Sequence, residues 1–384
     1  KGNVSRWGGG VTVRIISSDV MDGLRQLPDE SVHCVVTSPP YYGLRSYLRQ
    51  DHPLKHLEIG QEPTLQEHIA KLVSVFAEVR RVLRKDGTLW LNYGDMWAHD
   101  NKWGGKTGGK QAYLNGESNA RYGREKRSAG LKPKDLCMAP HRLAIALQDS
   151  GWWVRSDIVW WKPNAMPESI TDRPSKSHEY IFLMSKSERY HYDGDAIREP
   201  YSDNSLGRYK YALQGTAPTC LQDGGDVSRR AREKGVHEPN PLGRNKRSVW
   251  TITTDAFCDA HFATFPPEIP EICIKAGCPL GGTVLDPFGG SGTVGLVADR
   301  LQRSAILIDL DPANLPMAER RIKSDAPLFA EVTQLSLSLH PETPRLCGTC
   351  VTLNAFPEDS NGCCSRLGKR AKTAPACGEW FGLE

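Results

Sequence analysis

Hydrophobic and polar positions follow two different periods along the chain. Residues 32–37 are apolar on both faces of an extended segment, as in a strand buried on both sides. Residues 64–83 instead place apolar side chains on one stripe, three and four positions apart, with charged side chains outside it. We therefore predict strands over 11–16, 32–37 and 88–92 and a helix over 64–83. This alternation is typical of an α/β sheet.

The second half of the chain continues the alternation and ends in a βαβ unit. From Pro266 onward the predicted order is helix, strand, glycine turn, helix, strand and helix, and the pattern is lost beyond about residue 335. The further predicted elements are helices over 140–149, 294–301 and 315–322 and strands over 154–161, 179–185, 283–285 and 305–310.

Composition excludes several classes of protein. The 384 residues are 39% hydrophobic and 24% charged, so the chain is not disordered and can bury a sizeable core. No apolar run reaches the length of a membrane span, and residues 1–10 lack the apolar centre of a secretory signal. Six of the eleven cysteines are scattered through the first 300 residues, which favours reduced thiols in a cytoplasmic protein without membrane attachment.

The positive charge is concentrated in two interruptions of the pattern. Residues 99–130 and 201–247 are rich in Gly, Lys and Arg, and each segment carries a net charge of +4, as much as the whole chain. Trp and Tyr side chains lie between these charges, a composition that suits a phosphate backbone and unstacked bases. The alternative is a pair of solvated surface loops, which most charge runs are.

A glycine turn follows the predicted strand over 283–285 and opens a helix. Gly290-x-Gly292-x-x-Gly295 has the spacing of a dinucleotide-binding turn, and Asp309 follows at the end of the next strand, where a ribose-binding acid belongs. We therefore predict a cofactor that contains adenosine. NAD and S-adenosylmethionine both fit this pattern, but an acid at Asp286 repels a pyrophosphate and suits a cofactor with a positive amino-acid end.

The strand over 32–37 ends in Ser38-Pro39-Pro40-Tyr41. Two prolines remove two N–H donors and stop the strand, which leaves the Ser38 hydroxyl and the Pro39 carbonyl as unpaired acceptors at the edge where α/β proteins bind ligands. Acceptors of this kind suit an exocyclic amino group, and Tyr41 offers a face on which a flipped base can stack. The alternative is an ordinary proline-terminated strand with a packed tyrosine.

Together, the segments TSPPY and DPFGGSGT resemble the amino-methylating DNA methyltransferases, of both the N4-cytosine and the N6-adenine kinds. The resemblance covers residues 11 to about 325. It implies a Rossmann-like S-adenosylmethionine-dependent fold, and the catalytic turn that precedes the cofactor turn resembles the circularly permuted β group of the family. It further implies double-stranded DNA as partner, a bacterial or phage origin, a role in restriction-modification, and a homodimer, which members of the family often form.

The resemblance assigns residues to sites. It implies catalytic roles for Ser38, Pro39, Pro40 and Tyr41, with segments 132–136 and 160–164 beside the target base. The cofactor-binding residues that it implies are Asp19, Thr264, Phe265, Asp286, Pro287, Phe288, Gly289, Gly290, Ser291, Gly292, Thr293 and Asp309.

The residue pattern and the resemblance together predict a domain organisation. Residues 11–200 form the half with the catalytic turn and include the basic loop 99–130. Residues 201–250 form the target-recognition region, residues 251–335 the cofactor-binding half, and residues 336–384 a Cys-rich tail.

The implied reaction is direct methyl transfer to the exocyclic nitrogen of a flipped base, without a covalent enzyme intermediate. Cys34 lies inside an apolar strand and is interpreted as a core thiol, not as a nucleophile. Serine at position 38 goes more often with cytosine in the family, which favours cytosine N4 over adenine N6. The remaining alternatives are an NAD-dependent oxidoreductase and a non-catalytic nucleic-acid binder.

Five cysteines cluster in the last 38 residues. A Cys-x2-Cys pair and two later thiols permit a four-thiolate zinc site, which could stabilise a tail too short to fold alone. A tail with free thiols is an equal alternative, and an iron–sulfur cluster is a third. The predicted zinc ligands are Cys347, Cys350, Cys363 and Cys377.

Overall fold

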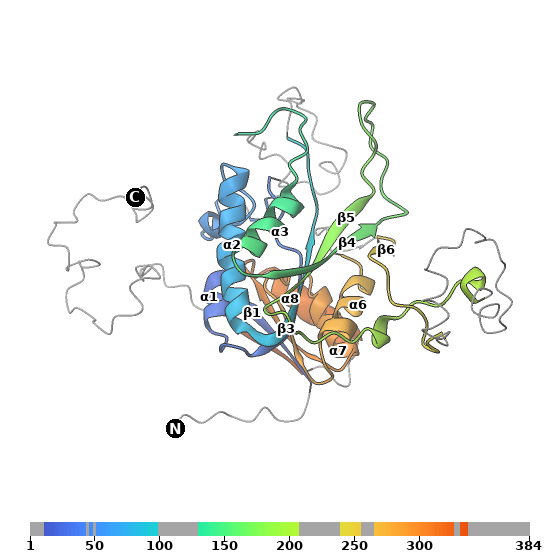
Figure 1. Cartoon of the computed structure of the whole chain (residues 1–384). Helices are drawn as coiled ribbons and strands as arrows, with labels where there is room; N and C mark the ends of the chain where they lie inside the picture. The colour runs from blue at the N-terminus through green and yellow to red at the C-terminus, as the bar shows by residue number, and fades with distance from the viewer. Residues whose placement is uncertain are drawn as a thin grey trace, which may run out of the picture. The chain divides into compact units, whose positions relative to one another are not determined.

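The computed structural model describes residues 11–43, 46–48, 51–98, 130–206, 239–254, 265–325 and 331–336, all of which belong to one compact unit. Its centre is one nine-stranded sheet with the order β6-β4-β5-β3-β2-β7-β8-β1-β9 (Figure 1). The strands are β1 (Thr12–Ser17), β2 (Val32–Thr37), β3 (Leu83–Tyr93), β4 (Trp153–Trp161), β5 (His178–Ser185), β6 (Val249–Thr251), β7 (Thr283–Asp286), β8 (Ser304–Asp309) and β9 (Glu331–Ser336).

Six neighbouring strands, in the order β3-β2-β7-β8-β1-β9, run in the same direction. β2 pairs in parallel with β7, β7 with β8, and β8 with β1. β5 is antiparallel to both β3 and β4. The carboxyl ends of β2, β7, β8 and β1 therefore meet at one edge of the sheet, whereas β5 enters that edge with its amino end.

Helices cover both faces of the sheet (Figure 1). α1 (Val20–Arg25), α2 (Leu65–Val82) and α3 (Ala139–Asp149) pack on one face, and α6 (Glu268–Gly277), α7 (Thr293–Arg300) and α8 (Asn314–Asp325) pack on the other. The strands divide their side chains between the two cores by alternation, so that Val35 joins the first core while Cys34 and Val36 join the second. Two short 3-10 helices are η1 (Lys55–Leu57) and η4 (Asp195–Ile197).

The predicted elements are present with small differences at their ends. The helix predicted over 64–83 is α2, and the Thr64 hydroxyl caps it by accepting the Glu67 N–H at 3.1 Å. The following strand begins at Leu83 and not at residue 88, because Leu83 pairs with Val32 of β2. Residues 86–87 lie inside β3 and not between the helix and the strand.

Two strands lie outside the predicted elements. β6 has three residues and pairs only with β4, and β9 is an edge strand beside β1 whose residues 333–335 are exposed. An edge strand that buries little carries no apolar run, so periodicity does not reveal it. Most of loop 99–130, most of region 201–250 and the tail beyond 336 lie outside the described residues, and the predictions for them stay predictions. None of the described helices is long and apolar enough to cross a membrane.

Candidate active site

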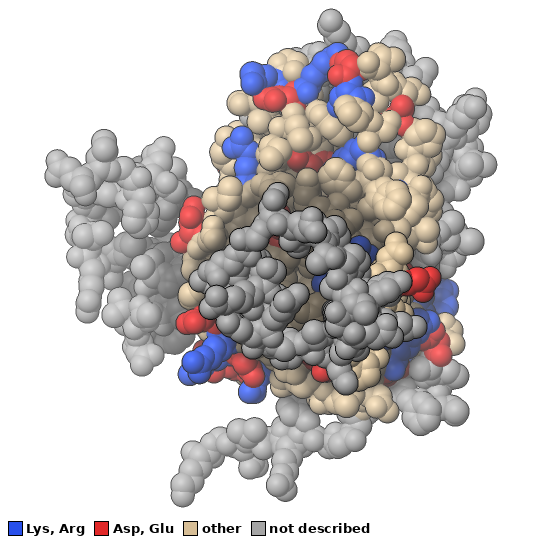
Figure 2. All heavy atoms as spheres, turned by 45° about the vertical axis from the view of Figure 1, so that its right-hand side comes forward, with Lys and Arg blue, Asp and Glu red and all other residues tan. Residues whose placement is uncertain are grey.

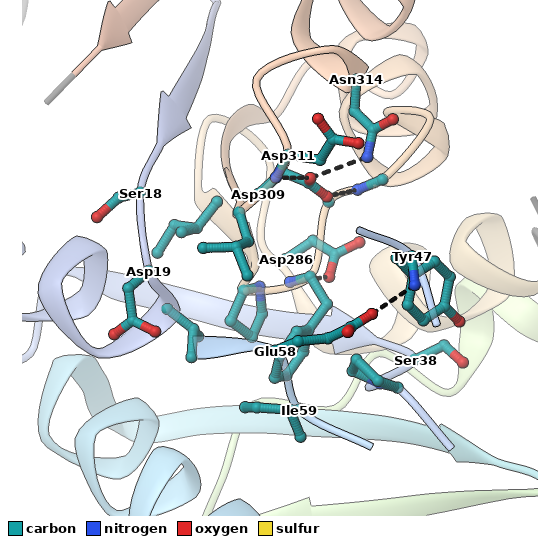
Figure 3. Close-up of a pocket in the computed structure, with 18 of the residues that line it drawn as sticks. Ser18, Asp19, Ser38, Tyr47, Glu58, Ile59, Asp286, Asp309, Asp311 and Asn314 are labelled. Atoms are coloured by element: carbon teal, nitrogen blue, oxygen red, sulfur yellow. Dashed lines mark hydrogen bonds between the residues drawn. The ribbon is translucent and has the colours of Figure 1, made fainter. Parts of the chain in front are cut away.

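A pocket lies at the edge where β2, β7, β8 and β1 end (Figure 3). Ser18 and Asp19 follow β1, Ser38 follows β2, and Asp286 ends β7 and leads into the glycine turn. In Figure 3, Asp19 and Ser38 lie on opposite sides of the view with Asp286 between them. Of the predicted cofactor residues, those that line the pocket are Asp19, Phe265, Asp286, Pro287, Phe288, Gly289, Gly290, Ser291, Thr293 and Asp309.

Gly290 and Gly292 of the turn have different structural roles. Gly290, at φ +48°, lines the pocket and donates its N–H to Asp309 Oδ2 at 2.7 Å. Gly292, at φ +78°, is not among the pocket residues, and a Cβ there would lie 2.8 Å from the Cβ of Ala318. Gly292 therefore permits α7 to pack against α8 and does not approach a ligand in this structure.

The Asp309 carboxylate joins the end of β8 to the glycine turn that follows β7. Its carboxylate accepts the N–H of Gly290, the N–H of Asp311 at 2.9 Å and the side-chain amide of Asn314 at 2.9 Å (Figure 3). Burial raises the pKa of Asp309, and these three donors oppose that shift. Asp311 and Asn314 also line the pocket, although sequence reasoning selected neither.

Asp286 is a buried carboxyl inside the pocket wall. It is 3% exposed, and its Oδ1 accepts the Thr37 hydroxyl at 2.7 Å and the Phe288 N–H at 3.0 Å. Burial raises its pKa to about 7, against the lowering effect of these two hydrogen bonds. A positive charge in the pocket would favour the ionised form of this carboxyl.

The wall from β1 contains an unsatisfied polar atom. Asp19 caps α1 by accepting the Met21 N–H at 3.0 Å, whereas the Ser18 hydroxyl is buried and has no hydrogen-bond partner among the described residues. Buried polar groups are nearly always hydrogen-bonded, so Ser18 Oγ indicates a ligand in this pocket. The remaining wall includes the apolar side chains of Leu48, Leu57 and Ile59.

Residues 46–48 and 51–59 contribute to the site, and sequence reasoning missed them. Glu58, which is 6% exposed, accepts the N–H groups of Tyr47 and Leu48 and pairs with Lys55, and so holds residues 47–48 beside residues 55–58 at the pocket. These residues have no regular periodicity that identifies them beforehand. Phe265 lies 8% exposed in the same wall, and Thr264 lies outside the described residues.

The pocket suits S-adenosylmethionine. It combines the free hydroxyl of Ser18, carboxylates from three strand ends and an apolar wall, which match the polar nucleoside, the positive groups and the carbon chain of that molecule. Asp286, for which the lead-in to the glycine turn predicts a contact with a positive amino-acid end, lines this pocket.

The Ser-Pro-Pro-Tyr turn joins this pocket to a second, polar cluster. Ser38 and Pro40 line the pocket, whereas Pro39 is buried and Tyr41 is turned into the cluster. The Ser38 hydroxyl is 3.3 Å from the Tyr41 hydroxyl, to which it donates, and accepts the Asn92 amide at 3.4 Å. The expectation that Ser38 is unpaired is therefore wrong, because the fold brings Tyr41 and Asn92 to it.

The cluster continues to a carboxylate that sequence reasoning did not select. Tyr41 donates its hydroxyl proton to Glu179 Oε2 at 2.8 Å, and Asn92 Nδ2 donates to the same oxygen at 3.2 Å. Glu179 Oε1 pairs with Lys162, from the segment 160–164 predicted beside the target base. Burial, and next the charge of Glu179, raise the pKa of Tyr41 well above its usual range, so the phenol keeps its proton.

The ring of Tyr41 is held from the side as well as at its hydroxyl. Its centroid lies 4.8 Å from that of Tyr93, with the ring planes at 58°. A Cβ on Gly94 would lie 2.6 Å from the Tyr41 ring, so only glycine leaves the ring in its place. Tyr41 is therefore held in one place by its neighbours within the protein.

The described thiols take no part in the site. Cys34 is fully buried, and burial raises its pKa well above the usual range, which agrees with a core thiol. Within the described residues, no group of three or more His, Cys, Asp or Glu side chains could hold a metal. Cys347, Cys350, Cys363 and Cys377 lie outside the described residues.

The described surface carries charges of both signs. On the face in Figure 2, Lys and Arg side chains lie interspersed with Asp and Glu side chains. The described part of that face has no broad positive area. The basic excess that the sequence places in 99–130 and 201–247 falls mostly outside the described residues.

Comparisons with known proteins agree with this geometry. The family model of N6 and N4 methyltransferases, described as DNA methylase, matches residues 32–320. The type II methyltransferase M.XycI of Xanthomonas campestris pv. cyanopsidis is 44% identical over 80% of this chain and 87% of its own length. M.SmaI of Serratia marcescens is 40% identical over 80% of this chain and 90% of its own length.

Solved structures give more distant matches. TTHA0409 of Thermus thermophilus, solved in complex with S-adenosyl-L-methionine, is 21% identical over 85% of this chain and all of its own, with a TM-score of 0.49. The cytosine-N4-specific PvuII DNA methyltransferase is 19% identical over 82% of this chain and 90% of its own, with a TM-score of 0.46. The family match over most of the chain, the relatives above 30% identity and the site at the strand ends agree: the chain belongs to the family of amino-methylating DNA methylases.

Proposed function

We propose that this protein is a type II DNA methyltransferase that transfers a methyl group from S-adenosylmethionine to cytosine N4 at a specific site in double-stranded DNA. The class rests on family membership and on relatives that are named type II methyltransferases. The observation that carries the finer proposal is the position of Ser38. This residue lines the cofactor pocket and also belongs to the polar cluster with Tyr41, Asn92 and Glu179.

The residues of the pocket would hold the cofactor. Asp309 and Asp19 stand at the strand ends where the nucleoside would lie, and Asp286 supplies negative charge for a positive group. When bound, S-adenosylmethionine supplies an electrophilic methyl group on a positively charged sulfur. The pocket residues orient that methyl group and exclude water, which lowers the entropic part of the barrier.

Ser38 would act on the target base from the other side. A lone pair of its hydroxyl oxygen accepts a hydrogen bond from the exocyclic amino group, which draws the nitrogen toward tetrahedral geometry and frees its own electron pair for attack. Tyr41, fixed against Tyr93, offers ring surface to the flipped base. Ser38 and Tyr41 would thus hold the amino nitrogen for direct attack on the methyl group, and the nitrogen would lose its extra proton to solvent.

Cytosine N4 is proposed over adenine N6 because serine stands at position 38. Methylation by the purified protein of plasmid DNA, followed by digestion to nucleosides and mass spectrometry, distinguishes the two directly. The proposal expects N4-methylcytosine. Recovery of N6-methyladenine would assign the adenine alternative, and absence of any methylated nucleoside would refute the methyltransferase proposal as a whole.

Three parts of the proposal concern the undescribed residues or the assembly. Residues 201–250 are proposed to read the DNA sequence, Cys347, Cys350, Cys363 and Cys377 to hold one zinc ion, and the protein to act as a homodimer. Exchange of 201–250 with the same region of a relative should change the methylated site. Metal analysis below about half an equivalent of zinc would exclude the metal site, and sedimentation equilibrium measures the oligomeric state.

A further inference from the structure

The hydrogen-bond chain behind Ser38 has a fixed direction. An ionised carboxylate has only acceptors, so Glu179 Oε2 can receive protons from Tyr41 and Asn92 but cannot donate. The atom of Asn92 that faces Glu179 must therefore be the amide nitrogen. The same nitrogen points at the hydroxyl oxygens of Tyr41, at 3.2 Å, and of Ser38, at 3.4 Å.

This direction decides what Ser38 presents to a ligand. Tyr41 has one proton, and it is committed to Glu179 at 2.8 Å, so Tyr41 offers only its oxygen lone pair to Ser38. Ser38 turns its own proton toward Tyr41, over a longer distance of 3.3 Å. With its proton directed away from the pocket, Ser38 presents a lone pair at the pocket side.

We propose that Glu179 is a positioning residue that acts through Tyr41 to keep Ser38 an acceptor toward the amino group of the target base. The inference deepens the proposed function and rests on it. A serine free to rotate could donate its proton to the amino nitrogen and occupy the electron pair that must attack the methyl group. Glu179 excludes that arrangement.

The surroundings of the chain support such a role. Lys162 supplies the counter-charge to Glu179, and both side chains are 18% exposed. The Lys162 ammonium also lies 4.1 Å from the centre of the Trp160 ring, which holds it in place. Asn92 is 4% exposed, and its Oδ1 has no hydrogen-bond partner among the described residues. Because this cluster is poorly solvated, the hydrogen bonds that orient each hydroxyl are stronger than they would be in water.

The test compares Glu179→Gln, Tyr41→Phe and the double variant in the full-length protein. Glutamine keeps the shape of glutamate, but its amide can donate to Tyr41 and reverse the chain, and phenylalanine removes the middle link. Each single variant should lower kcat roughly 10- to 100-fold, while the Kd for S-adenosylmethionine and the KM for DNA change less than about twofold. If Glu179 acts only through Tyr41, the double variant should be no slower than Tyr41→Phe alone.

Control and contrary outcomes are defined by the same assays. Glu271→Gln removes a surface carboxylate that pairs with Lys275 at 2.6 Å on α6 and should leave kcat unchanged. A wild-type kcat in Glu179→Gln, or an equal loss from Glu179→Gln in the Tyr41→Phe background, overturns the inference. If Glu179→Gln does not fold, as seen by thermal melting, a wild-type kcat in Tyr41→Phe still overturns it. A wild-type protein that transfers no methyl group to DNA refutes the proposed function itself.

Discussion

The cofactor pocket and the polar cluster behind Ser38 share one turn but are assembled in different ways. The pocket takes most of its residues from one short stretch, 286–293, and from the ends of parallel strands. The cluster joins the turn 38–41 to single residues from three other segments, Asn92, Lys162 and Glu179, and the bond from Tyr41 to Glu179 spans 138 positions in the chain. A local motif therefore describes the pocket well, whereas the cluster exists only after the strands have paired.

The two regions should respond differently to substitution, and the largest contrast is expected at Tyr41. Tyr41→Ala removes the ring beside Tyr93 and the link between Ser38 and Glu179. Turnover should fall at least about 100-fold, because base capture and hydroxyl orientation are lost together. The Kd for S-adenosylmethionine, measured by calorimetry, should stay within about twofold. Full activity on duplex DNA would show that the catalytic site has been misplaced.

Asp309→Ala is the reciprocal change in the pocket. It removes the carboxylate that accepts from Gly290, Asp311 and Asn314, so the glycine turn loses its anchor to β8. Affinity for S-adenosylmethionine should fall roughly 10- to 100-fold, in line with the loss of hydrogen bonds to a charged group.

The two variants should differ most at a saturating concentration of S-adenosylmethionine. There, kcat of Asp309→Ala should recover most of the wild-type value, whereas kcat of Tyr41→Ala should stay low. Asp325→Ala removes the exposed pair with Arg300 and serves as control. Unchanged affinity in Asp309→Ala would remove this residue from the cofactor site.

Gly292→Ala tests whether position 292 must be glycine because a side chain there would clash with α8. The alanine Cβ would meet Ala318 at 2.8 Å, in a backbone conformation at φ +78°. Gly281→Ala is the matched control, since Gly281 has φ +69° but nothing within 4 Å of its Cβ position. The free energy of unfolding, from urea denaturation, should fall about 1–3 kcal/mol more for Gly292→Ala than for the control. Equal losses would mean that only the backbone conformation matters there.

The smallest effect is a pH dependence that links the two regions through Asp286, which accepts the hydroxyl of Thr37 just before Ser38. Its folded pKa of about 7 lies above the usual value for an aspartate. Binding of a cation favours the ionised form, so affinity for S-adenosylmethionine should rise several-fold from roughly pH 6 to 8. Asp286→Asn should bind more weakly and show a flat profile over this range.

The same pKa fixes the sign of the effect on stability. Because the folded form of Asp286 holds its proton more tightly than the unfolded chain, its contribution to stability without cofactor is full below about pH 4. That contribution is lost as pH rises through about 7. If ionisation of Asp286 between about pH 4 and 7 raised the melting temperature of the cofactor-free protein, the assignment would be contradicted.

Sequence patterns predicted much of the fold and of the pocket for specific physical reasons. The strand over 32–37 is buried on both faces, so its composition identifies it, and the predicted bounds are those of β2. The glycine turn and Asp309 both line the pocket, and the Gly290 N–H donates to Asp309. β6, β9 and residues 46–48 and 51–59 could not be found, because their positions depend on partners and not on their own apolar content.

The sequence by itself determined the α/β class, the glycine turn and the Ser-Pro-Pro-Tyr turn, because each depends on consecutive residues with restricted backbone conformations or a repeated burial pattern. The tertiary structure alone decided that Ser38 is not a free acceptor and that Tyr41, Asn92 and Glu179 are its partners. These contacts arise because antiparallel β5 brings its amino end to the edge where β2 and β3 end. Strand pairing between distant segments leaves no mark in the local sequence, so the chemistry of the cluster appears only in the folded chain.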